Sequence, residues 1–268
     1  MKKILYKNEW FLQHRVNQLG NFVMSTPLLI SLSEIYQRPI PVYFETDIIK
    51  TLYINAGFIK ILKNKPRPGY IWSSCPPKEK NKNESDTECY MRLYADKLGY
   101  TKPIPNTYVD INNSVELDKV KGKKYIALFH GCFSPKNVEK KQLSKRVLQY
   151  MIDSVIDRGN IPVLLGNKSD NDNYWSKIQI DDRAINYIDK LSLKDSVSIL
   201  NQTDLFLSND TGLYHVAGAL KKNGLVMWYK TDHIKNKCIF EGIEHCINYE
   251  GDDKVYMDSI KDFLDKNI

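Results

Sequence analysis

Short apolar runs alternate with segments of helical periodicity through the second half of the chain. The apolar runs lie at residues 125–129, 161–165, 185–188, 204–208 and 224–229. Such runs, closed by polar or glycine-containing loops, are typical of buried parallel strands. Apolar side chains at helical spacing follow at residues 143–157, 192–200 and 213–220. The repeated strand–helix–strand order predicts an α/β fold with a doubly wound parallel sheet, in which ligands bind at the carboxyl ends of the strands.

The first half shows the same order less clearly. A strand is expected at residues 10–16, with a loop at 17–21 after it. A helix should follow from about Ser25, with Pro27 in its first turn, where a missing N–H group costs nothing. The remaining expected elements are a strand at 41–44, a helix at 48–56, a loop at 63–87 and a helix at 87–99.

A domain boundary is expected near residue 118. The preceding stretch, residues 101–123, lacks periodicity and contains Pro103, Pro105 and Gly122, as linkers do. We therefore expect one domain at residues 1–118, a second at 119–255, and a final amphipathic helix at 256–268.

Composition narrows the class of protein. Hydrophobic residues make up 42% of the 268 residues and charged residues 26%, which suits a folded core. No apolar run approaches the roughly 20 residues that span a bilayer, and no secretory signal is visible. The five scattered cysteines form no Cys-x-x-Cys pair and the five histidines no His-x-x-x-His pair, so no disulfide framework or metal site is expected. A cytoplasmic protein without a transmembrane segment is predicted, and peripheral contact with the membrane stays open.

The net charge of +7 is concentrated in two segments. Residues 119–150 hold nine Lys and Arg against one acidic residue, and residues 60–82 hold seven against one. Such segments suit a partner that carries phosphate, whether a nucleotide, an anionic glycolipid surface or nucleic acid. A solvated lysine-rich surface is the alternative for each segment.

The most informative segment joins the apolar run 204–208 to the helix after it. Free N–H groups at a helix N-terminus attract phosphate, and the hydroxyls of Ser208 and Thr211 add donors there. The helix is expected to start at Gly212, which places His215 one turn inside it, on the side that faces the loop. Asp210 is suited to fix the loop through backbone N–H groups or to hold a ribose hydroxyl. An ordinary helix cap with a packed histidine is the competing interpretation.

This segment resembles the C-terminal signature of glycosyltransferase family 9, the ADP-heptose:lipopolysaccharide heptosyltransferases, which reads Ser-x-Asp-Thr-Gly-x-x-His-x-Ala-x-Ala. Other segments resemble family motifs in the same order. Residues 19–29 resemble a Gly-Asp-x-x-x-x-Thr-Pro-x-Leu motif, and residues 130–136 a strand-end loop closed by lysine. Residues 163–167 resemble a Val-x-Leu-x-Gly-Gly strand, residues 191–193 the segment before the penultimate helix, and residues 227–232 a Phe-Gly-Pro-Thr-Asp motif.

The resemblance implies a GT-B fold, in which two Rossmann-like doubly wound domains face each other across a cleft. The C-terminal domain would hold a nucleotide-diphosphate sugar, the N-terminal domain would hold the acceptor, and the final helix would pack toward the first domain. Transfer in this family inverts the anomeric centre and requires no metal or other cofactor. The leaving diphosphate is then stabilised by cations and helix-terminal N–H groups, a role that we assign to Lys136, the helix start and His215. The residues expected to bind the donor are Gly131, Gly166, Leu191, Ser208, Asp210, Thr211, Gly212, His215 and Thr231.

The chain departs from the family at the expected general base. The N-terminal motif of the family has an aspartate after its glycine, and here Asn21 stands at that position. An amide cannot accept a proton at neutral pH, so Asn21 could orient an acceptor without deprotonating it. Glu45 and Asp47 follow the next strand and are the candidate replacements, with a solvent-facing helix cap as the alternative for each.

Three functions compete. The leading hypothesis is an inverting, metal-independent glycosyltransferase that moves a sugar from an ADP- or UDP-sugar to a cell-surface glycan such as lipopolysaccharide core, a glycolipid at the inner membrane surface. A second is transfer to a modified base in DNA, with the basic segments on phosphates and Tyr70, Trp72 or Tyr90 stacked on a displaced base. The third, suggested by Asn21, is a non-catalytic binder of nucleotide-sugars.

Overall fold

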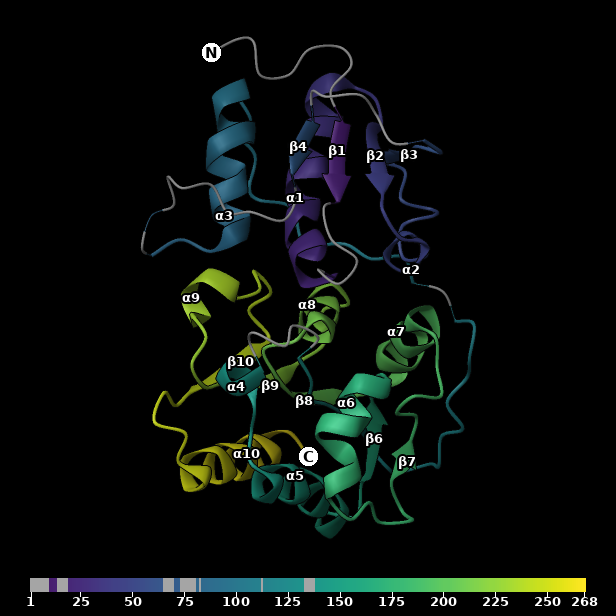
Figure 1. The fold of residues 1–268 in the computed structure, drawn as a ribbon, viewed down its shortest axis with the longest axis vertical. Coiled ribbons are helices and arrows are strands. Elements are labelled where there is room, and N and C mark those ends of the chain that lie inside the picture. The colour runs from purple at the N-terminus through teal and green to yellow at the C-terminus, as the bar shows by residue number, and fades with distance from the viewer. Residues whose placement is uncertain are drawn as a thin grey trace. The chain divides into compact units, whose positions relative to one another are not determined.

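The computed structural model describes residues 10–13, 19–64, 70–72, 81, 83–111, 113–132 and 138–268. The chain divides into two compact units (Figure 1). One comprises Met1–Asp110 and Ile234–Ile239, and the other comprises Ile111–His233 and Phe240–Ile268. Each unit contains one parallel sheet with helices packed against it, so the α/β class is confirmed.

The first unit is built on a four-stranded sheet in the order β3-β2-β1-β4, in which every neighbouring pair is parallel. Its strands are β1 (Trp10–Gln13), β2 (Ile40–Phe44), β3 (Ile59–Ile61) and β4 (Tyr70–Trp72). The rings of Phe22, Phe44 and Tyr53 contact one another with centroids 4.7 to 6.0 Å apart, at the centre of this unit's core.

Helix α1 (Leu19–Tyr36) differs from the sequence-based expectation. It already includes Asn21, where a loop was predicted, and Pro27 lies in its interior instead of its first turn. An interior proline leaves the carbonyl four residues earlier without its N–H donor. Here the Thr26 hydroxyl donates to that carbonyl, Val23 O, at 2.7 Å. Thr26 Oγ1 in turn accepts the N–H of Tyr108 at 2.8 Å. The Thr-Pro pair therefore continues the helix where a proline alone would interrupt it.

Three other predictions in the first unit change. The helix expected at 48–56 is only α2 (Asp47–Lys50), followed by turns. The loop expected at 63–87 contains β4, which is too short to give a periodic pattern and is defined by its pairing with β1. The helix expected at 87–99 forms as α3 (Asp86–Tyr90), a π-helix (Met91–Ala95) and a 3-10 helix (Asp96–Leu98), and Gly99 at φ +86° ends it.

The second unit is built on a six-stranded sheet in the order β10-β9-β8-β5-β6-β7, again parallel throughout. Its strands are β5 (Tyr125–Phe129), β6 (Ile161–Leu165), β7 (Ile185–Asn186), β8 (Leu205–Asn209), β9 (Gly224–Trp228) and β10 (Ile243–Ile247). The chain runs from β5 to β6 and β7 on one side, then returns to β8 on the other side of β5. The topological switch, where doubly wound sheets bind ligands, therefore lies between β5 and β8.

The helices of this unit are α4 (Val138–Lys141), α5 (Lys145–Asp157), α6 (Lys168–Asn173), a 3-10 helix (Trp175–Lys177), α7 (Leu193–Gln202), α8 (Gly212–Ala219), α9 (His233–Asn236, which extends into the first unit) and α10 (Asp253–Asn267). The caps of α5, α7 and α8 are Ser144, Ser192 and Thr211, each of which accepts a backbone N–H from the first turn of its helix. The helical segment expected at residues 192–200 forms as α7.

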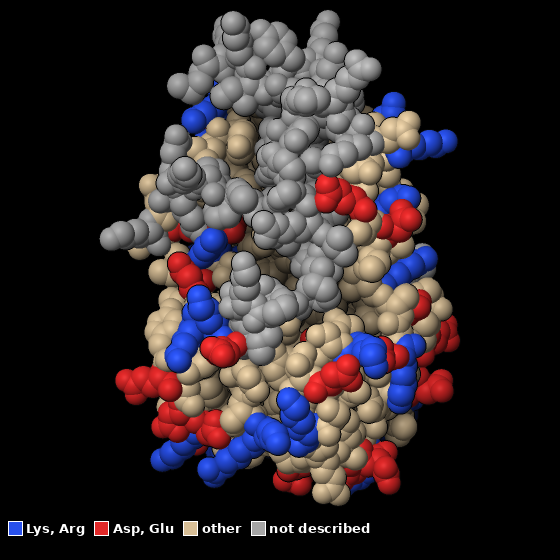
Figure 2. Space-filling view, viewed as in Figure 1, with Lys and Arg blue, Asp and Glu red and all other residues tan. Residues whose placement is uncertain are grey.

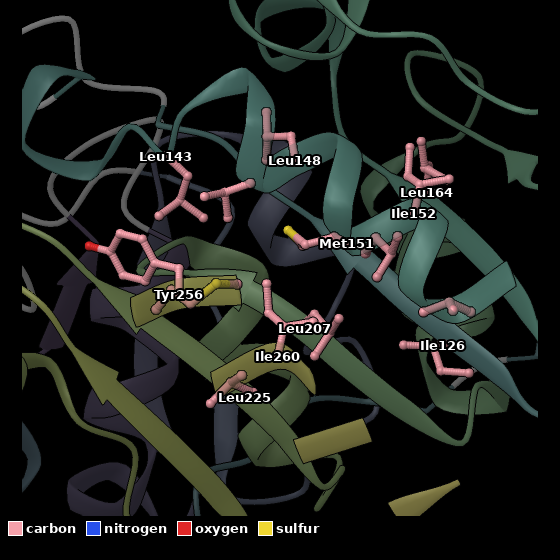
Figure 3. Packing of buried hydrophobic residues seen from close by; sticks show 14 of the residues in the cluster. Ile126, Leu143, Leu148, Met151, Ile152, Leu164, Leu207, Leu225, Tyr256 and Ile260 are labelled. Carbon is pink, nitrogen blue, oxygen red and sulfur yellow. The ribbon is translucent and has the colours of Figure 1, made fainter. Parts of the chain in front are cut away.

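One large hydrophobic cluster joins α5 and α10 to a face of the second sheet (Figure 3). Met151 and Ile152 from α5 and Ile260 from α10 meet Ile126 and Leu207 from the strands, and all five side chains are fully buried. The apolar side of α10, which was expected to face the first domain, is accounted for by this packing within the second unit.

Candidate functional site

The loops after β5 and β8 meet at the switch point and are joined by one buried side chain. Asn209, the last residue of β8, is 1% exposed. Its amide oxygen accepts the N–H of Gly131 at 3.2 Å, and its amide nitrogen donates to Gly131 O at 3.2 Å and to Lys141 O at 2.9 Å. Asn209 thus holds the β5 loop and the end of α4 together, directly before Asp210.

Lys141 forms a buried ion pair at the same point. Its Nζ lies 2.8 Å from Asp210 Oδ2 and donates to the Asp210 carbonyl oxygen, also at 2.8 Å. The two side chains are 19% and 4% exposed. An ammonium carries three donors, and these contacts account for two of them. The remaining N–H can therefore reach an anion without loss of the ion pair.

Helix α8 begins directly after this pair. Thr211 Oγ1 accepts the N–H groups of Leu213 and Tyr214 at 3.2 and 3.4 Å, and its own hydroxyl proton has no acceptor among the residues that the structure describes. Gly212 starts the helix with no side chain over the first turn. The positive end of the helix dipole and the first-turn N–H groups form an anion-binding position.

His215 lies one turn into α8 and is 4% exposed. Its Nδ1 is buried and has no hydrogen-bond partner among the residues that the structure describes. Burial lowers the pKa of His215 to about 4, the Asp210 carboxylate opposes this shift, and the Lys141 ammonium adds to it. The imidazole is therefore neutral at pH 7, and an arriving anion would raise its pKa.

Asp170, on α6, closes the other side of the β5 loop. A Cβ built on Gly131 would lie 2.0 Å from Asp170 Oδ1, so a side chain at residue 131 would force this carboxylate to move. Asp170 Oδ2 accepts the N–H of Asn167 at 3.0 Å, in a capping box at the end of β6. Burial raises the pKa of Asp170 to about 6, against the effect of that hydrogen bond. A carboxylate beside the switch point is suited to accept hydroxyl groups of a ribose.

Buried polar atoms without partners gather at this edge. In the described part of the second unit they are His130 Nδ1, Tyr174 OH, His215 Nδ1 and Thr231 Oγ1. His130 directly follows β5, and its ring centroid lies 4.4 Å from that of Tyr174, which follows α6. Thr231 lies after β9. Buried polar groups are nearly always paired in folded proteins, so this concentration marks the edge as a place where a ligand can supply partners.

The other residues expected at the donor site have varied surroundings. Lys136 lies outside the described residues. Ser208 is fully buried within β8, and its hydroxyl donates to Asn209 O at 2.6 Å, so it points away from a ligand position at the loop. Gly166 follows β6, and a Cβ there would lie 3.2 Å from Asp170 Cβ. Leu191 is half-buried just before α7.

The catalytic candidates of the first unit lie near the carboxyl end of its sheet. Asn21 is half-buried in the first turn of α1 as the structure describes it, and Glu45 is half-buried directly after β2. Asp47 has a side chain that is 87% exposed and pairs with Lys50 at 2.7 Å. Asp47 is therefore a solvent-facing residue of the α2 first turn, and Glu45 remains the better-placed acid.

The basic segment 119–150 divides between two edges of the second sheet. Lys141 lies at the carboxyl edge, whereas Lys123 and Lys124 immediately precede β5 at the opposite edge. There they donate to carbonyl oxygens of Gly159 and Asn267, at the C-terminal ends of α5 and α10. Over the second unit, on the face shown in Figure 2, basic and acidic side chains are interspersed. Tyr90, one of the candidates for stacking on a displaced base, is 2% exposed and belongs to the core.

Sequence reasoning missed three residues of the site: Lys141, Asn209 and Asp170. Asp170 had a readable signal, because Asn167 and Asp170 stand at capping-box spacing after an apolar run. Lys141 was one of nine basic residues in its segment, and only the position of α4 distinguishes it. Asn209 lies between Ser208 and Asp210 in the segment that was singled out, but its three hydrogen bonds depend on residues 68 to 78 positions away.

Neither a metal cluster nor a membrane span is seen in the described ranges. No three His, Cys, Asp or Glu side chains there are grouped so that they could hold a metal ion. No helix there combines the length and apolar character needed to cross a bilayer.

A model of the family "Glycosyltransferase family 9 (heptosyltransferase)" matches residues 51–262, which leaves out the motif with Asn21. No curated protein sequence matches the chain.

Solved structures with a similar fold include three proteins. The glycosyl transferase family 9 protein from Veillonella parvula is 13% identical with a TM-score of 0.70, over 99% of this chain and 91% of that one. E. coli ADP-heptose lps heptosyltransferase II is 12% identical with a TM-score of 0.71, over 97% and 99%. E. coli heptosyltransferase WaaC, solved with ADP, is 13% identical with a TM-score of 0.61, over 97% and 100%. The expected GT-B fold class is confirmed by these similarities.

Proposed function

We propose that this chain, which belongs to glycosyltransferase family 9 (heptosyltransferase), transfers a sugar from a nucleotide-diphosphate donor held by its second unit. One observation carries the assignment of the donor site: Lys141, the capped start of α8 and His215, whose Nδ1 has no hydrogen-bond partner in the described ranges, converge at the switch between β5 and β8. These are two positive groups and a neutral donor around one position, as a diphosphate requires.

The donor is an ADP- or UDP-sugar. Its diphosphate lies against the α8 N-terminus and the third N–H of Lys141, and its ribose lies toward Asp170. The solved structure of WaaC with ADP supports an adenine nucleotide. The glycines at 131 and 166 allow the Asp170 side chain to approach the loop backbone closely.

Transfer is a single displacement that inverts the anomeric carbon. The acceptor hydroxyl oxygen forms a bond to that carbon while the bond from the carbon to the diphosphate oxygen breaks. The diphosphate leaves with the electron pair, and Lys141 and the α8 N–H groups stabilise its new charge without a metal ion. The hydroxyl proton passes to a base, for which Glu45 is the candidate in the first unit.

The acceptor is a cell-surface glycan such as lipopolysaccharide core, presented at the inner membrane surface and bound by the first unit. The name of the E. coli lps heptosyltransferase II supports this class of acceptor. Asn21 favours a second candidate function, a nucleotide-sugar binder without turnover, because an amide stands where the resemblance expects the base.

Donor binding is tested by thermal unfolding with ADP, UDP, GDP and their sugars, each with magnesium and with EDTA. A ligand at 100 times its Kd adds about 2.7 kcal/mol to the unfolding free energy. We expect one nucleoside diphosphate to stabilise the protein equally in both buffers, and Lys141→Met to reduce that stabilisation. Lys123→Met is the control and should bind as the unchanged protein does. Absence of stabilisation by every nucleotide would contradict the proposal.

Turnover is then tested by mass spectrometry of truncated lipopolysaccharide core incubated with the bound nucleotide-sugar. Gain of one sugar mass with release of the nucleoside diphosphate is expected. Tight donor binding without transfer would instead favour the non-catalytic binder, and a gain in rate with Asn21→Asp would place the proton acceptor at that position.

A further inference from the structure

A separate pocket of about 300 Å³ opens in the second unit between the N-terminal ends of α5 and α10. The residues of its lining that matter here are Glu139, Gln142, Leu143, Tyr229, Asp253 and Tyr256. None of the residues expected to bind the donor lines it. A volume of this size is at the lower end for small-molecule sites, about 300 to 1,000 Å³, and suits a ligand such as a single sugar ring.

The floor of the pocket is the end of the large hydrophobic cluster. Leu143 and Tyr256 belong to that cluster, are each 2% exposed, and lie next to each other at one end of it (Figure 3). The Tyr256 hydroxyl donates toward two carbonyl oxygens, Trp228 O at 3.0 Å and Asn248 O at 2.9 Å. The floor is therefore apolar and fixed in position.

One wall is aromatic and depends on a glycine. A Cβ at Gly251 would lie 2.8 Å from Tyr229 Cε2, so the absence of a side chain allows the Tyr229 ring to pack against the backbone. Gly251 also has φ +77°, which favours glycine. Aromatic rings beside a polar rim offer apolar contact area together with hydrogen bonding.

The described rim consists of hydrogen-bonding groups that carry no positive charge. Glu139 and Asp253 contribute carboxylates and Gln142 an amide, and none of the described residues that line the pocket is Lys, Arg or His. Carboxylates accept hydrogen bonds and repel phosphate. The N-terminal ends of α5 and α10 offset part of their negative charge, so the ligand that fits is uncharged, has an apolar face and carries several hydroxyl groups.

We propose that this pocket binds a neutral saccharide ring. Part of its wall comes from the segment 139–144, which also contains Lys141. The Lys141 carbonyl oxygen accepts a hydrogen bond from Asn209, and Lys140 O accepts the N–H of Lys230 at 2.9 Å. The pocket and the donor site thus share one segment of chain. If the chain transfers sugar to a glycan, as proposed above, this pocket holds a further unit of that glycan.

Saturation-transfer NMR on the full chain tests the pocket with methyl α-glucoside, methyl α-galactoside and methyl α-mannoside as probes. At least one of them is expected to bind, and 1 mM ADP should not displace it. Glu139→Ala/Gln142→Ala changes two exposed side chains and should weaken that binding at least tenfold. Glu244→Ala, a surface acid on β10 paired with Lys266, is the matched control and should leave it unchanged.

Four results would overturn the assignment: no glycoside signal, displacement by ADP, unchanged binding in the double variant, or signal only from a cationic probe such as glucosamine. ADP binding is measured on the same samples. Loss of ADP binding with retained glycoside binding would count against the proposed donor site alone, and the reverse would count against the pocket alone.

Discussion

The two edges of the second sheet both carry lysines, but the partners of those lysines differ. At the amino-terminal edge Lys123, Lys124 and Lys222 donate to carbonyl oxygens of Gly159, Asn267 and Thr203, at the C-terminal ends of α5, α10 and α7. Helices of a doubly wound fold run antiparallel to its strands, so their negative dipole ends gather at this edge and cations there are stabilising. At the carboxyl edge Lys141 is bound to a buried aspartate beside a helix N-terminus.

This difference distinguishes the lysines that stabilise the fold from the lysine that we propose binds a ligand. In the described second unit the buried polar atoms without partners lie at the carboxyl edge, at His130, Tyr174, His215 and Thr231. The amino-terminal edge has its side chains paired with backbone. A positive segment in the sequence is therefore a weak guide to a phosphate site, because most of its charge can be used to cap helices.

Removal of Lys141 should have the largest effect. Lys141→Met removes the cation that pairs with the buried Asp210 carboxylate, which costs about 3–5 kcal/mol of unfolding free energy. Lys123→Met removes an exposed cation at a helix C-terminus and should cost less than about 1 kcal/mol. Urea unfolding of both variants measures the difference.

The double variant Lys141→Met/Asp210→Asn also removes the buried Asp210 charge, so it separates the cost of burying that charge from the effect of the lysine on nucleotide binding. It should recover most of the stability that Lys141→Met loses, while nucleotide binding stays weak. Equal losses for the two single lysine variants would remove the distinction between the edges.

A second comparison of the two edges uses one asparagine at each, Asn209 and Asn160. Asn209→Asp places carboxylate oxygens against the carbonyls of Gly131 and Lys141, so a loss of about 1–3 kcal/mol is expected. Asn160, at the amino-terminal edge, accepts the N–H of Lys124 at 3.0 Å and donates to Arg158 O at 3.2 Å. Asn160→Asp should cost less, because this site is closer to solvent. Urea unfolding again gives both values, and a larger loss at Asn160 would contradict the comparison.

The last comparison concerns the dependence of stability on acid, which is spread over several pH units. Burial lowers the pKa of His130 to about 3 and that of His215 to about 4, from an ordinary value of about 6.5. Below pH 6.5 the unfolded chain therefore binds protons that the folded chain does not, and the unfolding free energy falls by up to about 1.4 kcal/mol per pH unit for each histidine. Above pH 6.5 this contribution is complete.

Asp170 opposes that trend over part of the range. Its pKa of about 6 lies above the ordinary value, so the folded chain binds the extra proton and stability from this group falls as the pH rises toward 6. Denaturant titrations from pH 7.5 to 4.5 should show a net loss in acid. His130→Gln, which keeps an acceptor for the N–H of Leu143, should flatten the slope, and an unchanged slope would contradict the assignment.

The second unit was predictable because each of its main strands is a complete apolar run ended by a polar loop. Local sequence therefore determined β5, β6, β8 and β9 closely. The first unit was less predictable because its decisive contacts are distant in sequence. Pro27 inside α1 depends on the Thr26 hydroxyl, which also accepts from Tyr108, 82 residues away.

The candidate site shows the same limit. The start of α8 could be located from the loop sequence, and Thr211 and His215 with it. The choice of Lys141 among many lysines could not be made, because α4 separates it from the strand end that sequence reasoning used. Asn209 and Asp170 act through contacts to Gly131, and no local pattern predicts those contacts.

The contact between Asp170 and Gly131 restricts how related sequences can vary. A methyl group at residue 131 would overlap the Asp170 carboxylate in its present position, so the two positions are coupled. A lineage that acquires alanine at 131 must shift the Asp170 side chain or replace it with a smaller residue, and with the smaller residue it loses the acid beside the loop. Among relatives of this chain, residue 131 is thus a marker that can be read from sequence alone: those with a side chain there have given up this carboxylate or moved it.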